Sequence, residues 1–211
     1  MSALRDALRG AGLSLEVHAD AEARITRFLE LRAHWARTHN LAGPRALSAP
    51  WRGDVIDGLA VSQVMAPGLP LVDVGAGGGV PGLVVAALDP ARAVILVEPR
   101  AKRAAFLRTA AYALELSEVR VMRARWPLES SLGGHQVVSR AVVSPARWPS
   151  FALQGGPEVL GIIRMLAAHR PELEGLGVEL RRAVDYTLDP DGDRRVEFWA
   201  RVGEMARAET G

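Results

Sequence analysis

The residues best suited to chemistry lie in a glycine-rich stretch between Asp73 and Gly82, which reads DVGAGGGVPG. Four of the five residues from Gly75 to Gly79 are glycines. Glycine leaves the backbone bare, so the chain can turn sharply and a ligand can lie directly against it. A tight turn alone would need only one or two glycines. The stretch therefore favours a ligand-binding loop.

The loop lacks the signatures of two common ligand classes. The dinucleotide fingerprint G-x-G-x-x-G would require a third glycine at Val80, and a loop for nucleoside triphosphates would end in Gly-Lys-Ser or Gly-Lys-Thr. Instead, Asp73 precedes the glycines, and Glu98 follows the next predicted strand. Glu98 is either a solvated strand end or an acceptor for ribose hydroxyls. Two carboxylates without a phosphate clamp suit a cationic nucleoside, and S-adenosylmethionine fits that description.

The elements that must position these residues follow from the hydrophobic pattern. Helical patterns at Pro81–Leu88 and Arg100–Leu116 alternate with short apolar runs. This alternation predicts right-handed crossovers and a parallel sheet covered on both faces. Two further runs, Val178–Thr187 and Arg195–Val202, flank the turn sequence DPDGD and predict an antiparallel hairpin. The predicted parallel strands are Leu71–Val74, Ala93–Val97, Val119–Met122, Gln136–Ser139 and Val159–Ile163.

The first part of the chain, residues 1–67, has a helical pattern throughout. Apolar residues recur at steps of three and four after Asp20, which could cap this helix. A second helix is predicted over Asp54–Met65. We expect a helical extension at 1–67 packed on a core at 68–211, forming one structural unit. The polar face of the first of these helices is predicted to hold Arg24, Arg27 and Arg32.

Composition adds limits rather than an activity. The 211 residues include 26 basic and 24 acidic ones, and a net charge of +2 does not by itself indicate a nucleic-acid binder. No cysteine is present, which excludes disulfides, thiolate metal sites and cysteine nucleophiles. The histidines lack metal-ligand spacing, so no metal site is expected. No apolar stretch is long enough to suggest a membrane span, and we expect a cytoplasmic protein.

Charge is distributed unevenly along the chain. Between Glu98 and Arg125, the cations exceed the acidic residues by four. This excess is either a solvated helix face with its loop or a surface that meets phosphates. The cations are Arg100, Lys102, Arg103, Arg108, Arg120, Arg123 and Arg125, and the acids are Glu98, Glu115 and Glu118.

These motifs together resemble the RsmG (GidB) family, bacterial enzymes that methylate N7 of a guanine in small-subunit ribosomal RNA. The resemblance spans residues 25 to 202 approximately. It implies a class I methyltransferase (Rossmann-like) fold with a seven-stranded, mostly parallel sheet, an antiparallel C-terminal hairpin and an N-terminal helical cap. It is carried by DVGxGxGxPG at 73–82, Glu98, KRxxFL at 102–107, the triplet Ser139-Arg140-Ala141, Asn40-Leu41, Asp57 and Arg194.

The resemblance also implies roles for individual residues. S-adenosylmethionine would be the methyl donor, and 16S ribosomal RNA in the small ribosomal subunit would be the substrate of a monomeric enzyme. Ser139 and Arg140 are the catalytic candidates, although Ser139 could equally be a polar strand terminus. Trp126 could stack on adenine or belong to the core. Donor binding is assigned to Asp73, Gly75, Ala76, Gly77, Gly79, Glu98 and Arg125, and RNA binding to Lys102, Arg103, Arg140 and Arg194.

The chemistry of guanine N7 agrees with the residues present. N7 carries a lone pair and no proton, so methyl transfer needs no general base beforehand. The fourth predicted strand accordingly lacks an amine-positioning motif of the Asn-Pro-Pro-Tyr type. Alignment of the reacting atoms is then the main task, and alignment can contribute roughly 7–11 kcal/mol in favourable cases.

Several positions depart from the family pattern. Asp54 stands where the family has His, and Gly58 follows Asp57 where the family has Ser. His135 replaces an Asp in the fourth strand. In the fifth strand the usual Lys-Gly is Arg164-Met165, and the missing glycine could displace the nearby backbone. The departures leave open a methyltransferase of the same fold acting on another RNA or a small molecule, or an RNA-binding module without turnover. The residue at position 80 disfavours an NAD-dependent oxidoreductase.

Overall fold

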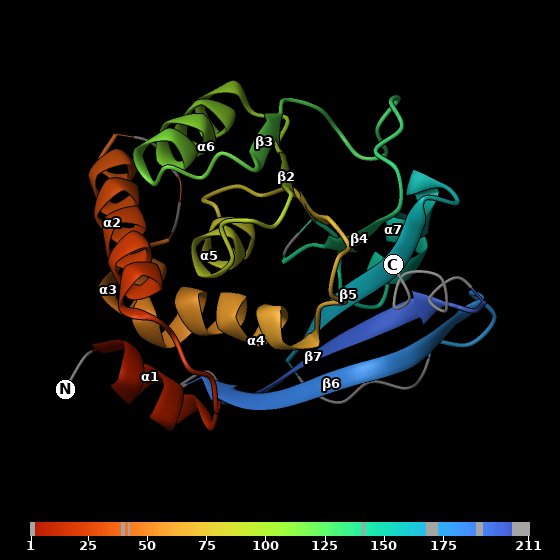
Figure 1. Ribbon diagram of the computed structural model, residues 1–211, viewed down its shortest axis with the longest axis horizontal. Coiled ribbons are helices and arrows are strands. Elements are labelled where there is room, and N and C mark those ends of the chain that lie inside the picture. The colour runs from red at the N-terminus through yellow and green to blue at the C-terminus, as the bar shows by residue number, and fades with distance from the viewer. Residues whose placement is uncertain are drawn as a thin grey trace.

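The computed structural model describes residues 3–38, 41, 43–140, 142–167, 173–188 and 192–203. A single seven-stranded sheet runs through it in the order β3-β2-β1-β4-β5-β7-β6 (Figure 1). The first five strands are parallel, whereas β7 is antiparallel to both β5 and β6. The predicted sheet and hairpin are confirmed. The strands are β1 (Leu71–Val74), β2 (Val94–Val97), β3 (Val119–Met122), β4 (His135–Val138), β5 (Val159–Leu166), β6 (Val178–Leu188) and β7 (Gly192–Arg201).

Burial explains why the short apolar runs form strands. Every residue of β1, β2 and β4 is buried, as expected for parallel strands that are covered on both faces. The edge strand β3 is only half-buried. Alternate residues along β1 and β2 belong to two different hydrophobic clusters, one on each face of the sheet.

The helices cover the two faces unequally. On one face, α4, α5 and α6 each contact the sheet, α6 at β3 and α4 at the β6–β7 hairpin, while α2 packs on α5 from outside (Figure 1). The other face is covered by the short α7 and by loops. The helices are α1 (Ala3–Ala11), α2 (Ala19–Ala36), α3 (Pro44–Ser48), the π-helical turn η1 (Trp51–Val55), α4 (Ile56–Val64), α5 (Gly82–Leu88), α6 (Ala101–Ala113), α7 (Trp148–Ala152) and the 3-10 turn η2 (Leu153–Gly155).

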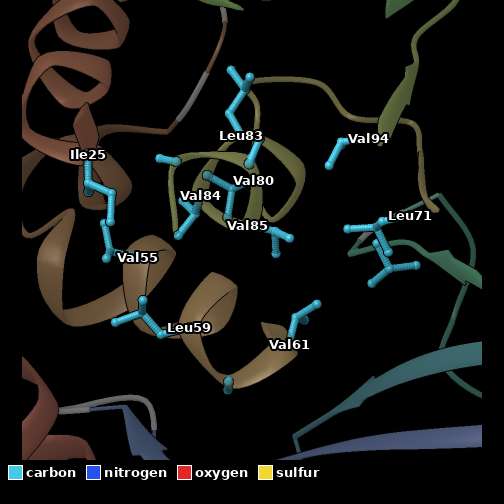
Figure 2. Close-up of a cluster of buried hydrophobic side chains, with 14 of the residues drawn as sticks. Ile25, Val55, Leu59, Val61, Leu71, Val80, Leu83, Val84, Val85 and Val94 are labelled. Atoms are coloured by element: carbon cyan, nitrogen blue, oxygen red, sulfur yellow. The ribbon is translucent and has the colours of Figure 1, made fainter. Parts of the chain in front are cut away.

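One core joins the N-terminal helices to the sheet. Figure 2 shows side chains from α2, α4, α5, β1 and β2 converging, among them Ile25, Leu59 and Leu83. All three are completely buried. Burial of apolar surface therefore stabilises the helices before residue 67 together with the sheet. The division of the chain at residue 67 stays a prediction.

Two details of the N-terminal helices were predicted wrongly. The N-cap position of α2 is His18, which makes no side-chain cap hydrogen bond, and Asp20 lies in the first helical turn. Arg32 is buried on the inner face of α2 rather than exposed beside Arg24 and Arg27. Arg32 lies four residues after Phe28, so the apolar spacing already indicated an inward position. An ion pair with Asp54 compensates its charge.

Gly58 brings α4 close to α5. A Cβ atom built at Gly58 would lie 2.6 Å from Cβ and Cγ1 of Val84. Any larger residue would therefore push the two helices apart or force Val84 to move. This contact explains why a glycine is suitable at position 58, where the RsmG (GidB) family that the sequence resembles has Ser.

We expect Gly58→Ala to lower the free energy of unfolding by about 1–2 kcal/mol, because overpacking outweighs the ~1 kcal/mol that alanine gains over glycine within a helix. Gly10→Ala in α1 is the matched control, since Gly10 has no neighbour within 4 Å of an added Cβ. The control should be neutral or stabilising. Urea unfolding measures both variants, and equal changes in stability would contradict the packing argument.

Candidate functional site

The glycine-rich loop lies where the strand order reverses. It connects β1 to α5, and β1 pairs with β2 on one side and β4 on the other. Ligands of open parallel sheets bind outside the carboxyl ends of the strands at this point. The backbone amides of Gly75 and Ala76 donate to the carbonyl of Val97, at 2.8 and 3.1 Å. The start of the loop is thereby attached to the end of β2.

Two buried carboxylates hold the loop, one at its middle and one at its end. Glu98 Oε2 accepts a hydrogen bond from the amide of Gly77 at 3.0 Å, and its Oε1 accepts one from the amide of Arg100 at 2.9 Å. Asp73 Oδ2 accepts a hydrogen bond from the amide of Gly82 at 2.9 Å. Glu98 and Asp73 are 3% and 1% exposed. The predicted pair of acids is therefore part of the loop's own support.

Burial changes the acidity of Asp73. The pKa of this carboxyl is raised to about 7, mainly by desolvation and to a smaller extent by the nearby Glu98, whereas the Gly82 amide and Arg140 act in the opposite direction. Asp73 thus titrates near neutral pH, so a cation bound beside it would favour its ionised form.

Close contacts explain two of the glycines. Gly75 has a φ of +72°, and a Cβ atom there would lie 2.2 Å from Cγ2 of Val142. A Cβ atom at Gly78 would lie 2.7 Å from the carbonyl oxygen of Leu41 and 3.2 Å from Nε of Arg32. Segments from the N-terminal helices and from beyond β4 thus enclose the loop.

A cavity of about 570 Å³ opens beside the loop. Arg125 lines it with an exposed side chain, while Trp126 is buried and donates its Nε1–H to the carbonyl of Phe151 at 3.1 Å. Trp126 therefore belongs to the core and also forms a wall of the cavity. The lining includes Val74, Gly75, Val97, Glu98, Arg100, Arg103, Arg125, Trp126 and Val142.

A larger cavity, of about 870 Å³, lies between α6 and β3. It contains none of the predicted site residues, and its lining includes Arg108, Tyr112 and Arg120. The smaller cavity at the switch point is the candidate site because it combines bare backbone with a buried carboxylate.

Ser139 and Arg140 follow β4 directly. Ser139 is buried, and its Oγ accepts a hydrogen bond from the amide of Val142 at 3.4 Å, which agrees with a polar strand terminus. Arg140 Nη1 forms an ion pair with Asp54 and lies 3.5 Å from Oδ2 of Asp57. The Arg140 side chain is 34% exposed, so it remains accessible from outside. Ala141 lies outside the described residues, as does Asn40.

The sequence analysis missed a buried polar network next to Arg140. Asp54 also pairs with Arg32, and both side chains are nearly inaccessible. Asp57 Oδ1 accepts a hydrogen bond from the Tyr186 hydroxyl at 2.8 Å. Burial raises the pKa of Asp57, although Arg140 and the hydroxyl oppose the shift. Burial and the Asp57 charge likewise raise the pKa of Tyr186, which keeps its hydroxyl a donor.

The predicted RNA-binding residues occupy different places. Lys102 is exposed in the first turn of α6, whereas Arg103 lines the cavity beside the loop. Arg194, on β7, lines a separate depression of about 520 Å³ that also includes Tyr186. The positive charges of Arg140 and Arg194 both lower the pKa of Asp57, so both arginines lie near the same network.

In the fifth strand, Arg164-Met165 stands where the resemblance implies Lys-Gly, and an ion pair accommodates Arg164. Arg164 Nε lies 2.8 Å from Oε2 of Glu197 across the β5–β7 pair, and both side chains are buried. Met165 pairs with Val196 in a register that is continuous from Gly161 to Leu166. The expected displacement of the backbone at Met165 was therefore wrong, because regular strand pairing holds it.

His135 lies at the opposite end of its strand from the site. Its neighbour Gln136 pairs with Leu71, the first residue of β1. His135 Nδ1 lies 2.7 Å from the carbonyl oxygen of Gly133, and burial lowers the pKa of the imidazole. This departure therefore affects the sheet rather than the cavity.

Within the ranges given above, no group of three His, Asp or Glu side chains could hold a metal ion. No helix in the described part of the chain is both long and apolar enough to cross a bilayer.

The strand order, the glycine loop after β1 and the acid after β2 define a class I, Rossmann-like methyltransferase fold. A solved human structure, "methyltransferase 10 domain containing protein", has a similar fold, with a TM-score of 0.54 and 16% identity over 87% of this chain and 98% of that one. A family model described as "GidB: rRNA small subunit methyltransferase G" matches residues 21–172. The chain belongs to this family.

Curated relatives agree with that assignment. Ribosomal RNA small subunit methyltransferase G of Dichelobacter nodosus is 34% identical over 135 residues, which is 63% of each chain. The protein of the same name from Nitrosospira multiformis is 39% identical over 132 residues, 62% of this chain and 61% of that protein. The match thus spans less than two thirds of these relatives' length.

Removing one partner of the buried Arg164–Glu197 pair should be strongly destabilising. Glu197→Gln should lower the free energy of unfolding by about 3–5 kcal/mol, because it leaves a buried guanidinium without its counter-charge. Asp185→Asn is the control: Asp185 pairs with Arg195 on the surface and should contribute less than about 1 kcal/mol. Similar losses in the two variants, measured by denaturant unfolding, would contradict the role assigned to burial.

Proposed function

We propose that the protein uses S-adenosylmethionine to methylate N7 of a guanine in 16S ribosomal RNA of the small ribosomal subunit. The observation that carries this proposal is the glycine loop held by Glu98 at the mouth of the switch-point cavity. Membership of the small-subunit methyltransferase family supports the substrate class.

The residues present fit S-adenosylmethionine. A cavity of about 570 Å³ lies within the range for small-molecule sites. Gly75 and Gly77 carry no side chain of their own, and each Glu98 oxygen keeps a lone pair after accepting its backbone hydrogen bond. Ionised Asp73 and Glu98 would favour a cationic ligand. When bound, S-adenosylmethionine supplies an electrophilic methyl group next to its positive charge.

The protein's own task is then to position the acceptor. The N7 lone pair of guanine attacks the methyl carbon without first losing a proton, so no general base is required. Ser139 and Arg140 follow β4 beside the loop and are proposed to align the base and the adjoining backbone. Holding reactants in a near-attack arrangement is a large part of catalysis in such transfers.

Cationic side chains are proposed to hold the RNA backbone. Arg103 and Arg125 line the cavity, and Arg140 belongs to the neighbouring network. Lys102 is exposed on α6, and Arg194 lines a separate depression. Phosphate contacts of this kind fix orientation rather than read sequence. A ribosomal substrate would place the protein in the cytoplasm, and we propose that it acts as a monomer.

The direct test measures donor binding and methyl transfer separately. Labelled donor and small subunits from a strain lacking the modification should yield labelled N7-methylguanine in 16S RNA. Glu98→Ala should weaken donor affinity about tenfold or more, since it removes a charged acceptor from the site. Glu118→Ala, an exposed acid before β3, should leave affinity unchanged. Tight donor binding without labelled RNA would contradict the substrate assignment, and equal affinities in both variants would contradict the site.

Donor affinity should depend on pH through Asp73. Its pKa of about 7 means that the carboxyl is largely protonated below neutrality, and a cationic ligand prefers the ionised form. Affinity should therefore rise about tenfold between about pH 6 and about pH 8 and level off above. Asp73→Asn keeps an acceptor for the Gly82 amide but should remove this dependence. A wild-type affinity that is flat across the range, measured by calorimetry, would contradict the assignment.

A further inference from the structure

We propose that Asp54 is a positioning residue that holds Arg140 at the substrate side of the site, with the buried Arg32 as its fixed counter-charge. The inference rests on the proposed function and adds a residue to it. It concerns a position where this chain departs from its family's usual histidine.

The geometry places Asp54 between two arginines. Its Oδ2 pairs with Nη2 of Arg32, from α2, and its Oδ1 pairs with Nη1 of Arg140, which follows β4. These partners are 22 and 86 residues away in sequence. Asp54 itself lies in the π-helical turn η1, before α4 begins. One carboxylate thereby connects the N-terminal helices to the end of a central strand.

The environment makes this connection rigid on one side and accessible on the other. The side chains of Arg32 and Asp54 are 2% and 7% exposed, whereas that of Arg140 is 34% exposed. Arg32 also lies close to the glycine loop, since its Nε is 3.2 Å from the position that a Cβ would take at Gly78. Asp54 thus presents Arg140 from a fixed base.

The contacts leave Arg140 able to bind phosphate. The contacts given above for Arg140 within the described chain use Nη1, with Asp54 and with Asp57 at 3.5 Å. A guanidinium has five N–H donors in a planar fork, so other donors remain for an anion. Fixing the guanidinium by one nitrogen before RNA arrives reduces the entropy that is lost when it binds.

A purely electrostatic role for Asp54 predicts the opposite effect on RNA. Removing a negative charge near a phosphate-binding surface should strengthen the binding of a polyanion. A positioning role predicts weaker binding, because Arg140 loses its anchor. The sign of the change therefore separates the two roles.

The experiment must not leave a buried charge without its counter-charge. Asp54→Asn alone leaves Arg32 buried without its counter-charge and could prevent folding. The double variant Arg32→Met/Asp54→Leu removes both charges together with the acceptor for Arg140, and Arg32→Met alone is its reference because Asp54 can still hold Arg140. Glu30→Gln, which breaks an exposed pair with Arg27 on α2, is the matched control. Donor affinity and urea unfolding confirm that each variant is folded.

We expect the double variant to raise KM for small subunits about tenfold relative to Arg32→Met, with donor affinity changed less than twofold, since loss of alignment acts on the substrate step. In an Arg140→Ala background, adding the same double change should have no further effect on RNA affinity. Glu30→Gln should match the wild type. Equal or stronger RNA binding by the double variant, or additive losses with Arg140→Ala, would overturn the proposal.

The two proposals fail in different ways. If the wild type transfers methyl groups and the double variant matches its reference, Asp54 has no positioning role and the proposed function stands. If the wild type binds a 16S RNA fragment without transfer, the proposed function fails and RNA affinity still decides the role of Asp54. If the wild type neither binds nor methylates the RNA, both are contradicted.

Discussion

The site depends on backbone amides that donate to two buried carboxylates. Asp73 accepts from the first residue of α5, and Glu98 accepts from the middle of the glycine loop. Each acid lies at the end of a fully buried strand, so the sheet fixes its position. A loop made mostly of glycine is thus held in place by its neighbours. Both carboxyl groups are buried away from solvent, which is the cost of this arrangement, and an ionised Asp73 would favour a cationic ligand.

The N-terminal helices contribute to the site as well as to the core. The carbonyl of Leu41 and the guanidinium of Arg32 approach Gly78 closely, so these two residues confine the loop on the side of Gly78. Arg32 then connects through Asp54 to Arg140. The ionic chain Arg32–Asp54–Arg140 therefore runs from beside the glycine loop to the proposed RNA contact. In this arrangement, removing a single charge is more harmful than replacing the pair with neutral groups.

The strands and the glycine loop could be predicted because they depend on local pattern. A buried run such as Leu71–Val74 indicates a strand from its own residues, and the glycines that follow it outnumber those that a turn needs. The inward position of Arg32 could also have been predicted, because Arg32 continues the apolar spacing of α2, although its charge favoured the polar face. Its partner was not, because Asp54 lies 22 residues away in a π-helical turn that has no sequence signature. The Arg164–Glu197 pair was hidden for the same reason: cross-strand register appears only once the hairpin is placed.

A crystal structure of the protein with S-adenosylmethionine would test the central claim most directly. The account predicts that the ribose hydroxyls donate to Glu98, that the ligand lies against the backbone at Gly75 and Gly77, and that Arg140 remains paired with Asp54. A ligand bound in the larger cavity between α6 and β3, with the glycine loop uncontacted, would contradict it.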